Sequence, residues 1–151
     1  MKKIFSAIGI FLITAIVAVV TFIISGEKGK QLPTRTVTIG ERTMNVEIAD
    51  TVASRITGLS GRGFMGEDEG MFFIFPDSTI QKFWMKGMKF PIDIIWINGD
   101  KVIGMVMGAK PETGLDYTIY SSPEPADKVL EINAGLTQKF GIKIGDIVLF
   151  K

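Results

Sequence analysis

The sequence predicts a mainly β domain, a sandwich or barrel with two short helices, preceded by one transmembrane helix. The strand prediction comes from about eight short apolar or alternating runs at close spacing. Only two short segments of the domain have a helical period, and a parallel α/β sheet would need longer crossover helices. The transmembrane helix is predicted by a long uncharged run near the N-terminus.

The N-terminal run is expected to be an uncleaved membrane anchor. Two lysines precede residues 4–24, which carry no charge and would form a helix of about 31 Å, enough to cross a bilayer. Bulky residues before Ser25 make a poor cleavage site, so secretion after signal cleavage is the less favoured alternative. The lysines favour a cytoplasmic N-terminus, with the domain outside the cytoplasm at the cell membrane. The predicted segments are an anchor at 1–25, a polar linker at 26–34 and a β domain at 35–151.

A hairpin and a short helix are expected to open the domain. Gly40-Glu41 suits a two-residue turn with glycine first, which places Val37 opposite Met44. Asp50 is a plausible N-cap for the helix that follows. The spacing of the helical residues predicts a buried side made of Val52, Ile56 and Leu59.

The rest of the domain is predicted to be strands joined by turns, with one more helix. Asn98-Gly99 is the strongest hairpin signal in the chain, and a turn there places Asp93 opposite Gly104. Asn133 is expected to cap a second helix that ends at Gly141. Further strands are predicted at residues 71–75, 80–85, 92–97, 102–107, 129–132 and 147–150.

Composition excludes several classes of function. The chain has no Cys and no His, which excludes disulfides, thiolate zinc sites, cysteine nucleophiles and the Ser-His-Asp triad. The methionines are expected to fill the core, so no metal and no cofactor is predicted. Without the two N-terminal lysines, 15 basic residues face 16 acidic ones and no basic stripe appears, so nucleic acid is not an expected partner.

Several motifs occur along the domain in a specific order. They are Arg55-x-x-Gly58-Leu59, Arg62, Glu69-Gly70-Met71-Phe72-Phe73-x-Phe75, Phe83-Trp84-Met85-Lys86, Pro91-Ile92-Asp93-Ile94-Ile95, Val129-Leu130-Glu131 and Gly141-x-x-x-Gly145-Asp146. In combination, over about residues 36–151, they resemble the DUF192 family, also called UPF0127. The resemblance implies a jelly-roll-like β fold in a small secreted or membrane-anchored prokaryotic protein, and it implies no activity. The family usually has Asn-Thr after Trp-Met-Lys, where this chain has Gly87-Met88.

Asp93 is the residue that most needs an explanation. A carboxylate inside a strand of Ile and Trp is costly unless it is paired. Opposite Gly104 it would face open space, which an arginine from residues 55–62 is best suited to fill. We therefore expect Asp93 to lie in a pocket wall, paired with arginine.

Other candidates each have a structural alternative. Arg55 and Arg62 could grip an anionic ligand or pair with an internal acid. Trp84 could stack on a sugar or belong to the core. Glu131 could be an acid with a pKa raised by burial, or one half of a structural ion pair. The candidate ligand-binding residues are Arg55, Arg62, Trp84, Lys86, Asp93 and Glu131.

Two functions of different class fit these residues. The first is an extracytoplasmic binding or accessory module for a small polar or saccharide ligand, or for a membrane-protein partner. The second is a hydrolase or transferase that uses Asp93 and Glu131 as acid and base on a cell-envelope substrate. The second requires both carboxyl groups on one cleft wall, about 5–10 Å apart. The composition of the site favours the binding module.

Overall fold

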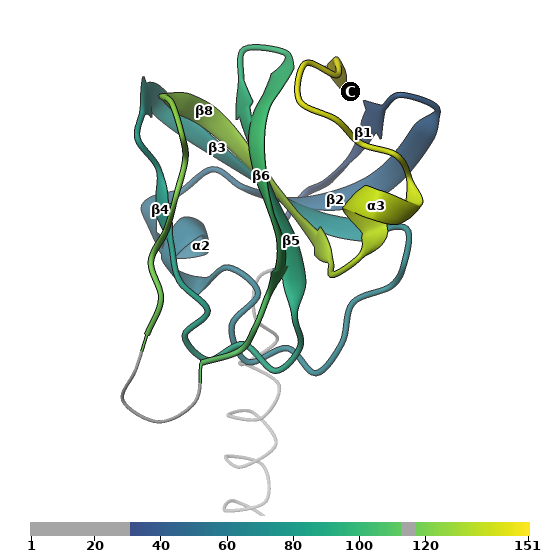
Figure 1. Ribbon diagram of the computed structural model, residues 1–151. Coiled ribbons are helices and arrows are strands. Elements are labelled where there is room, and N and C mark those ends of the chain that lie inside the picture. Colours follow the sequence, from purple (N-terminus) through teal and green to yellow (C-terminus); the bar gives the residue numbers. More distant parts are fainter. Residues whose placement is uncertain (1–30, 113–116) are drawn as a thin grey trace, which may run out of the picture. The chain divides into compact units, whose positions relative to one another are not determined.

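The computed structural model describes residues 31–112 and 117–151, shown as coloured ribbon in Figure 1. Within these two ranges no helix is both long and apolar enough to span a membrane. The predicted anchor at 1–25 lies outside the described residues, as does most of the predicted linker. The compact unit that holds every described strand is Leu32–Lys151.

The described residues form nine strands and two helices. The strands are β1 (Thr34–Ile39), β2 (Arg42–Ala49), β3 (Glu69–Thr79), β4 (Lys82–Phe83), β5 (Ile92–Asn98), β6 (Lys101–Ala109), β7 (Tyr120–Ser121), β8 (Ala126–Asn133) and β9 (Val148–Phe150). The helices are α2 (Val52–Thr57) and α3 (Leu136–Lys139). Seven strands form one sheet in the order β6-β5-β8-β3-β2-β1-β9, and β4 pairs with β7 in a separate ribbon.

The seven-stranded sheet curls into a half-barrel (Figure 1). Its two edges meet, because Val102 at the start of β6 exchanges backbone hydrogen bonds with the turn that leads into β9. The amide of Val102 donates to the carbonyl of Asp146 over 3.0 Å, and the amide of Gly145 donates back to Val102 over 2.8 Å. The prediction of a mainly β domain with two short helices is confirmed in this form.

The first hairpin has the predicted register. Val37 lies opposite Met44, and Ile39 lies opposite Arg42, which leaves Gly40 and Glu41 as the turn. Gly40 has a φ of +59°, the left-handed conformation that a glycine-first turn requires.

The predicted register of the second hairpin is wrong. Asn98 pairs with Lys101, so the turn is Gly99-Asp100, and Gly104 lies opposite Trp96 instead of Asp93. A type I′ turn on Asn98-Gly99 would need positive φ at both residues, but only Gly99 has it, at +61°. A register shift between the Trp96 and Ile97 pairs adds a further displacement.

Helix α2 differs from its prediction at both its cap and its faces. Thr51, not Asp50, is the N-cap, and it exchanges hydrogen bonds with Ser54 in a capping box. Leu59 is buried as expected, whereas Val52 and Ile56 are 67% and 68% exposed. The predicted buried side of this helix is therefore wrong at two of its three positions.

Helix α3 is shorter than predicted and has a different N-cap. Its N-cap is Gly135, with a φ of +86°, and it makes no side-chain capping bond there. Asn133 instead donates its side-chain amide to the carbonyls of Met65 and Gly66, over 2.8 and 3.1 Å. At the start of this helix, the amides of Gly135 and Thr137 instead donate to the side chain of Asp93 on strand β5.

Asp93 ties three parts of the backbone together. Its Oδ1 accepts from the amide of Gly108 over 2.8 Å, and its Oδ2 accepts from the amides of Gly135 and Thr137, each over 3.0 Å. The residue is fully buried. The predicted pairing of Asp93 with arginine is therefore wrong. Backbone donors stabilise the buried carboxylate in place of a guanidinium.

The space at Gly104, which the sequence suggested was open, is filled by another residue. Gly104 lies against Pro123, whose Cγ would be only 2.6 Å from a Cβ added at that glycine. On the neighbouring strand β8, the residue paired with Asp93 is Ile132.

Two apolar clusters cover the two faces of the sheet. The α3-side cluster contains Ile95, Leu130, Ile132 and Leu136 among its buried residues. The α2-side cluster contains Leu59, Met71, Phe73, Ile94 and Val129 among its buried residues. Residues paired across strands project to the same face, so Asp93 faces the α3 side with Ile132. Glu131 faces the α2 side with Met71 and Ile94.

Replacing Asp93 should destabilise the domain strongly. Asp93→Ala leaves three backbone amides without their acceptor, so we expect a loss of about 3 kcal/mol or more in the free energy of unfolding. Asp93→Asn keeps one acceptor oxygen and should lose less. Denaturant unfolding of residues 32–151 measures both, with the exposed Asp77→Ala as the matched control. An Asp93→Ala variant as stable as that control would contradict the structural role.

Candidate functional site

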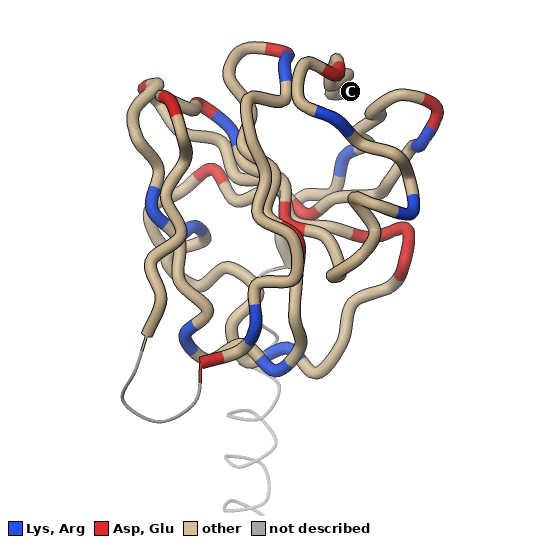
Figure 2. The backbone as a smooth tube through the Cα atoms, viewed as in Figure 1, with Lys and Arg blue, Asp and Glu red and all other residues tan. Residues whose placement is uncertain are grey.

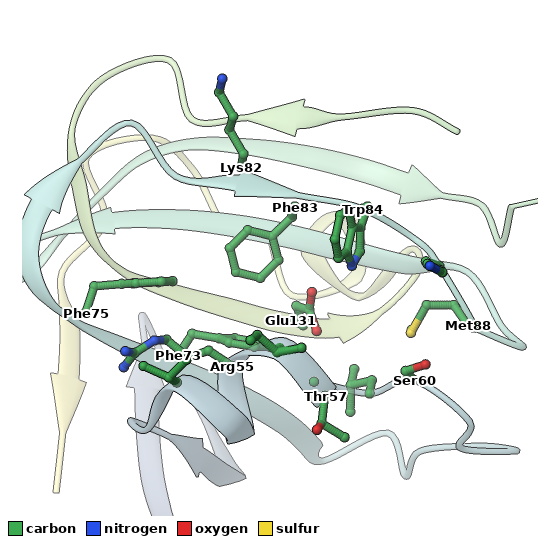
Figure 3. A pocket seen from close by; sticks show the side chains of 16 residues that line it. Arg55, Thr57, Ser60, Phe73, Phe75, Lys82, Phe83, Trp84, Met88 and Glu131 are labelled. Atoms are coloured by element: carbon green, nitrogen blue, oxygen red, sulfur yellow. The ribbon is translucent and has the colours of Figure 1, made fainter. Parts of the chain in front are cut away.

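A pocket of about 560 Å³ opens on the α2 side of the sheet (Figure 3). One wall is α2 with the turn after it, residues 52–60, and the opposite wall is β4 with the loop after it, residues 82–88. Phe73 and Phe75 of β3 and Glu131 of β8 complete the lining. The pocket therefore lies where two connections cross one face of the sheet.

Glu131 points into this pocket (Figure 3). The residue is 5% exposed. Burial raises the pKa of its carboxyl group to about 8, since charging it in an apolar surrounding is unfavourable. Among the described residues, its side chain takes part in no hydrogen bond and no ion pair. The structural ion pair expected for Glu131 is thus not formed with any described residue.

Aromatic rings border the pocket above and below this carboxyl group. The rings of Phe73 and Phe83 have centroids 5.0 Å apart and planes at 84°. Phe83 also makes edge contacts with Phe75 at 6.3 Å and with the core residue Trp96 at 5.4 Å. These edge contacts pack the rings into an apolar part of the pocket wall.

Trp84 differs from Trp96 in its surroundings. Trp96 is 1% exposed, as a core aromatic should be, whereas Trp84 is 53% exposed and lines the pocket. Alternation along the segment sends Phe83 toward the sheet, so its neighbour Trp84 faces out. Together with the exposed Val52 and Ile56, it leaves apolar surface uncovered around the pocket.

The charges around the pocket are mostly basic. Figure 2 shows acidic and basic residues interspersed along the domain, whereas the lining has three basic residues and one acid, Glu131. Arg55 donates to the carbonyls of Asp50 and Ile74, over 2.6 and 2.8 Å, and lies over the ring of Phe75. Lys82 and Lys86 are exposed and form no ion pair with any described residue.

The pocket brings together four of the six candidate residues. Arg55, Trp84, Lys86 and Glu131 line it. Asp93 does not line it, because its side chain lies on the opposite face of the sheet and accepts from the amide of Thr137 there.

Arg62 also lies outside the pocket lining. Both of its terminal guanidinium nitrogens donate to the carboxylate of Glu47, the Nη2–Oε2 contact being 2.7 Å. That bond holds the pKa of Glu47 below its usual range. Arg62 thus takes the internal pairing that was its structural alternative.

Sequence reasoning missed Lys82, Phe83, Val52 and Ile56 as lining residues. The last two were assigned to the core because an amphipathic period does not say what its apolar side will face. Lys82 and Phe83 lie within the strand predicted at residues 80–85, of which only Lys82–Phe83 forms β4, and a strand pattern does not show which of its residues will border a pocket.

Gly87 marks the place where the two walls of the pocket meet. Its φ is +73°, and a Cβ there would come within 2.2 Å of the hydroxyl oxygen of Ser60. The amide of Gly61 donates to the carbonyl of Gly87 over 2.9 Å. The departure from the family pattern at Gly87-Met88 therefore falls in the pocket, where a side chain at residue 87 would displace Ser60.

The lining residues fit an organic ligand better than a metal ion. Within residues 31–112 and 117–151, no three acidic side chains lie close enough together to hold a metal. Glu131 is also the one carboxyl group among the described lining residues. An apolar pocket with one buried polar group is typical of small-molecule sites.

The chain resembles known proteins along nearly all of the described domain. The model of the DUF192 family, described as an uncharacterized ACR, matches residues 35–150. A protein of unknown function from Novosphingobium aromaticivorans is 34% identical, with a TM-score of 0.75, over 82% of this chain and 89% of its own. A candidate transcription regulator from Sinorhizobium meliloti is 29% identical, with a TM-score of 0.74, over 80% of this chain and 96% of its own. No curated protein matches the chain.

Glu131 should make the domain less stable as the pH rises. The pKa of its carboxyl group is about 8 when folded and ordinarily 4.5, so the unfolded chain ionises first. The resulting loss in the free energy of unfolding begins above about pH 4.5 and levels off above about pH 8. Glu131→Gln removes this dependence.

The stability of Glu131→Gln relative to the wild type should therefore increase by about 3 kcal/mol from about pH 5.5 to pH 8. Denaturant unfolding of residues 32–151 at a series of pH values measures this difference. Glu124→Gln, at an exposed position, is the control and should show no such increase. Parallel pH profiles for the wild type and Glu131→Gln would exclude a raised pKa at this site.

Proposed function

The chain belongs to the DUF192 family, and we propose that it is a membrane-anchored module outside the cytoplasm that binds a small polar ligand, such as a saccharide unit, around Glu131. One observation carries the binding proposal. Glu131 is buried, points into an apolar pocket, and has no hydrogen-bond or ion-pair partner among the described residues. Such a group is costly to bury unless something else satisfies it. A ligand in the pocket would do so.

The exposed apolar residues around the pocket support the same proposal. Val52, Ile56 and Trp84 are each more than half exposed although they border one concave site. A ligand with an apolar ring face would cover them and gain from the burial. The volume of about 560 Å³ lies in the range of small-molecule sites, about 300–1,000 Å³.

The alternative, a two-carboxylate hydrolase or transferase, is not favoured. It requires a second carboxyl group on the same cleft wall as Glu131. Strand pairing puts Asp93 on the other face of the sheet, with its oxygens bound to three backbone amides. Binding therefore accounts for the pocket better than acid–base catalysis does.

The N-terminal anchor is expected to keep the full chain in the membrane. Residues 4–24 are long enough to cross a bilayer and lack a good cleavage site, so the run should remain attached. Intact mass of the chain from carbonate-washed membranes should include this run. A soluble chain that begins near Gly26 would contradict the anchor and favour secretion.

A ligand of the pocket should raise the melting temperature of the protein. Ligand at about 100 times its Kd stabilises by about 2.7 kcal/mol, which a thermal-shift screen detects. We would screen the full chain in a polyoxyethylene detergent, which carries no sugar, against monosaccharides, amines, carboxylates and nucleotides. Trp84→Ala should abolish any shift caused by a ligand of the pocket.

The matched control for Trp84→Ala is Phe64→Ala. Phe64 is 84% exposed and lies outside the pocket lining, so its loss should leave the shift unchanged. A screen in which no compound stabilises the wild type, or in which Trp84→Ala retains every shift, would refute the proposed site.

A further inference from the structure

We propose that the ligand is a small zwitterion, with an ammonium group against Glu131 and the aromatic rings and an acidic group beside Lys82 and Lys86. This inference rests on the proposed function, since it names the ligand class of the same pocket. Three features carry it: an unpartnered buried carboxyl group, aromatic walls, and two exposed lysines at the same site.

The first feature is the missing counter-charge of Glu131. Its neighbours across the sheet, Met71 on β3 and Ile94 on β5, carry no charge. Arg55 of α2 lines the pocket but bonds to two backbone carbonyls. Lys82 and Lys86 make no bond to Glu131. A cation brought by the ligand would supply the partner that the described chain does not.

The second feature is the aromatic lining. Phe73 and Phe83 meet at 84°, so ring surfaces of two orientations border the space, and Trp84 adds a half-exposed indole. The negative faces of aromatic rings attract cations, and indole does so best. An ammonium group in this pocket would be attracted both by the aromatic rings and by the carboxylate of Glu131. A quaternary ammonium group has no N–H to satisfy, so it needs no hydrogen-bond acceptor.

The third feature is the pair of lysines. Both are exposed and belong to the wall formed by residues 82–88, and the side chain of Lys82 extends outward from this wall, away from Glu131 (Figure 3). Their charges would repel a simple cation but favour a ligand that also carries a carboxylate or phosphate. A ligand with both charges satisfies Glu131 and the lysines together.

The competing ligand is a neutral polyol that bonds to protonated Glu131. The two ligands predict opposite pH dependences, because a cation favours the carboxylate whereas a polyol can use the carboxylic acid as donor. Affinity for a zwitterion should rise about 25-fold from about pH 6.5 to pH 8.5 as Glu131 ionises. Affinity for a polyol that accepts the proton of Glu131 should fall over the same range.

Three probes with the same branched head group test the proposal by calorimetry on the full chain in a polyoxyethylene detergent and amine-free buffer. Glycine betaine carries both charges, 3,3-dimethylbutanoate replaces its nitrogen by carbon, and tetramethylammonium lacks its carboxylate. Betaine should bind, and each of the other two should bind about tenfold more weakly or worse. Equal binding of 3,3-dimethylbutanoate and betaine would overturn the proposal.

Two variants assign the charges to residues. Glu131→Gln should weaken betaine binding about tenfold or more and abolish its pH dependence, while Glu124→Gln should change neither. Replacing Lys82 and Lys86 together by alanine should weaken betaine binding and leave tetramethylammonium no weaker. Unchanged betaine affinity in Glu131→Gln would also overturn the proposal.

The outcomes separate this inference from the proposed function. A monosaccharide that binds in the pocket while betaine does not would overturn the zwitterion and leave the binding module standing. If neither betaine nor any compound of the wider screen binds, both fall.

The same pair of charges occurs in free zwitterions and in lipid head groups. Betaine binding by the full chain in both phosphatidylcholine and phosphatidylglycerol vesicles would identify a free zwitterion. Betaine binding that is lost only in phosphatidylcholine vesicles would identify the head group, which then competes for the pocket.

Discussion

The pairing of β8 between β3 and β5 is the constraint on which the rest of the structure depends. Both faces of this strand are covered, so its alternation decides what each side of the sheet contains. Leu130 and Ile132 enter the α3-side cluster, while Val129 and Glu131 face the α2 side. Once the register is set, Glu131 lies on the face of the sheet that carries the pocket. A shift of one residue in the register of β8 would move each of its side chains to the opposite face, so both clusters would lose the residues that β8 contributes to them.

Two carboxyl groups are buried among the described residues, and their surroundings differ. Asp93 is satisfied by backbone amides from β6 and from the N-terminal end of α3, and it thereby ties these elements to β5. Glu131 is satisfied by nothing in the described chain, and burial raises the pKa of its carboxyl group to about 8. The first arrangement stabilises a fold. The second leaves a buried carboxyl group without a partner among the described residues, at a cost in stability, and the proposed binding site rests on this feature.

Local patterns explain the parts of the fold that local physics controls. Gly40-Glu41 gave the right register because one glycine with positive φ is enough for its turn. Asn98-Gly99 misled because the turn is Gly99-Asp100, with positive φ at Gly99 alone, and because the register shifts again between Trp96 and Ile97. The cap of α3 could not be foreseen from Asn133, since its acceptor comes from β5, about 40 residues away in the chain.

The sequence by itself determined the class of the domain, its short helices and most of its strands, and four of the six candidate residues that it offered line the pocket. Residue type and alternation suffice for these because they report burial and local conformation. Only the tertiary structure decided that Asp93 and Glu131 lie on opposite faces, that Arg62 is taken by Glu47, and that Val52 and Ile56 border a pocket. The reason is physical. Which face a residue shares, and with whom, depends on strand order and register across distant segments, which no local pattern encodes.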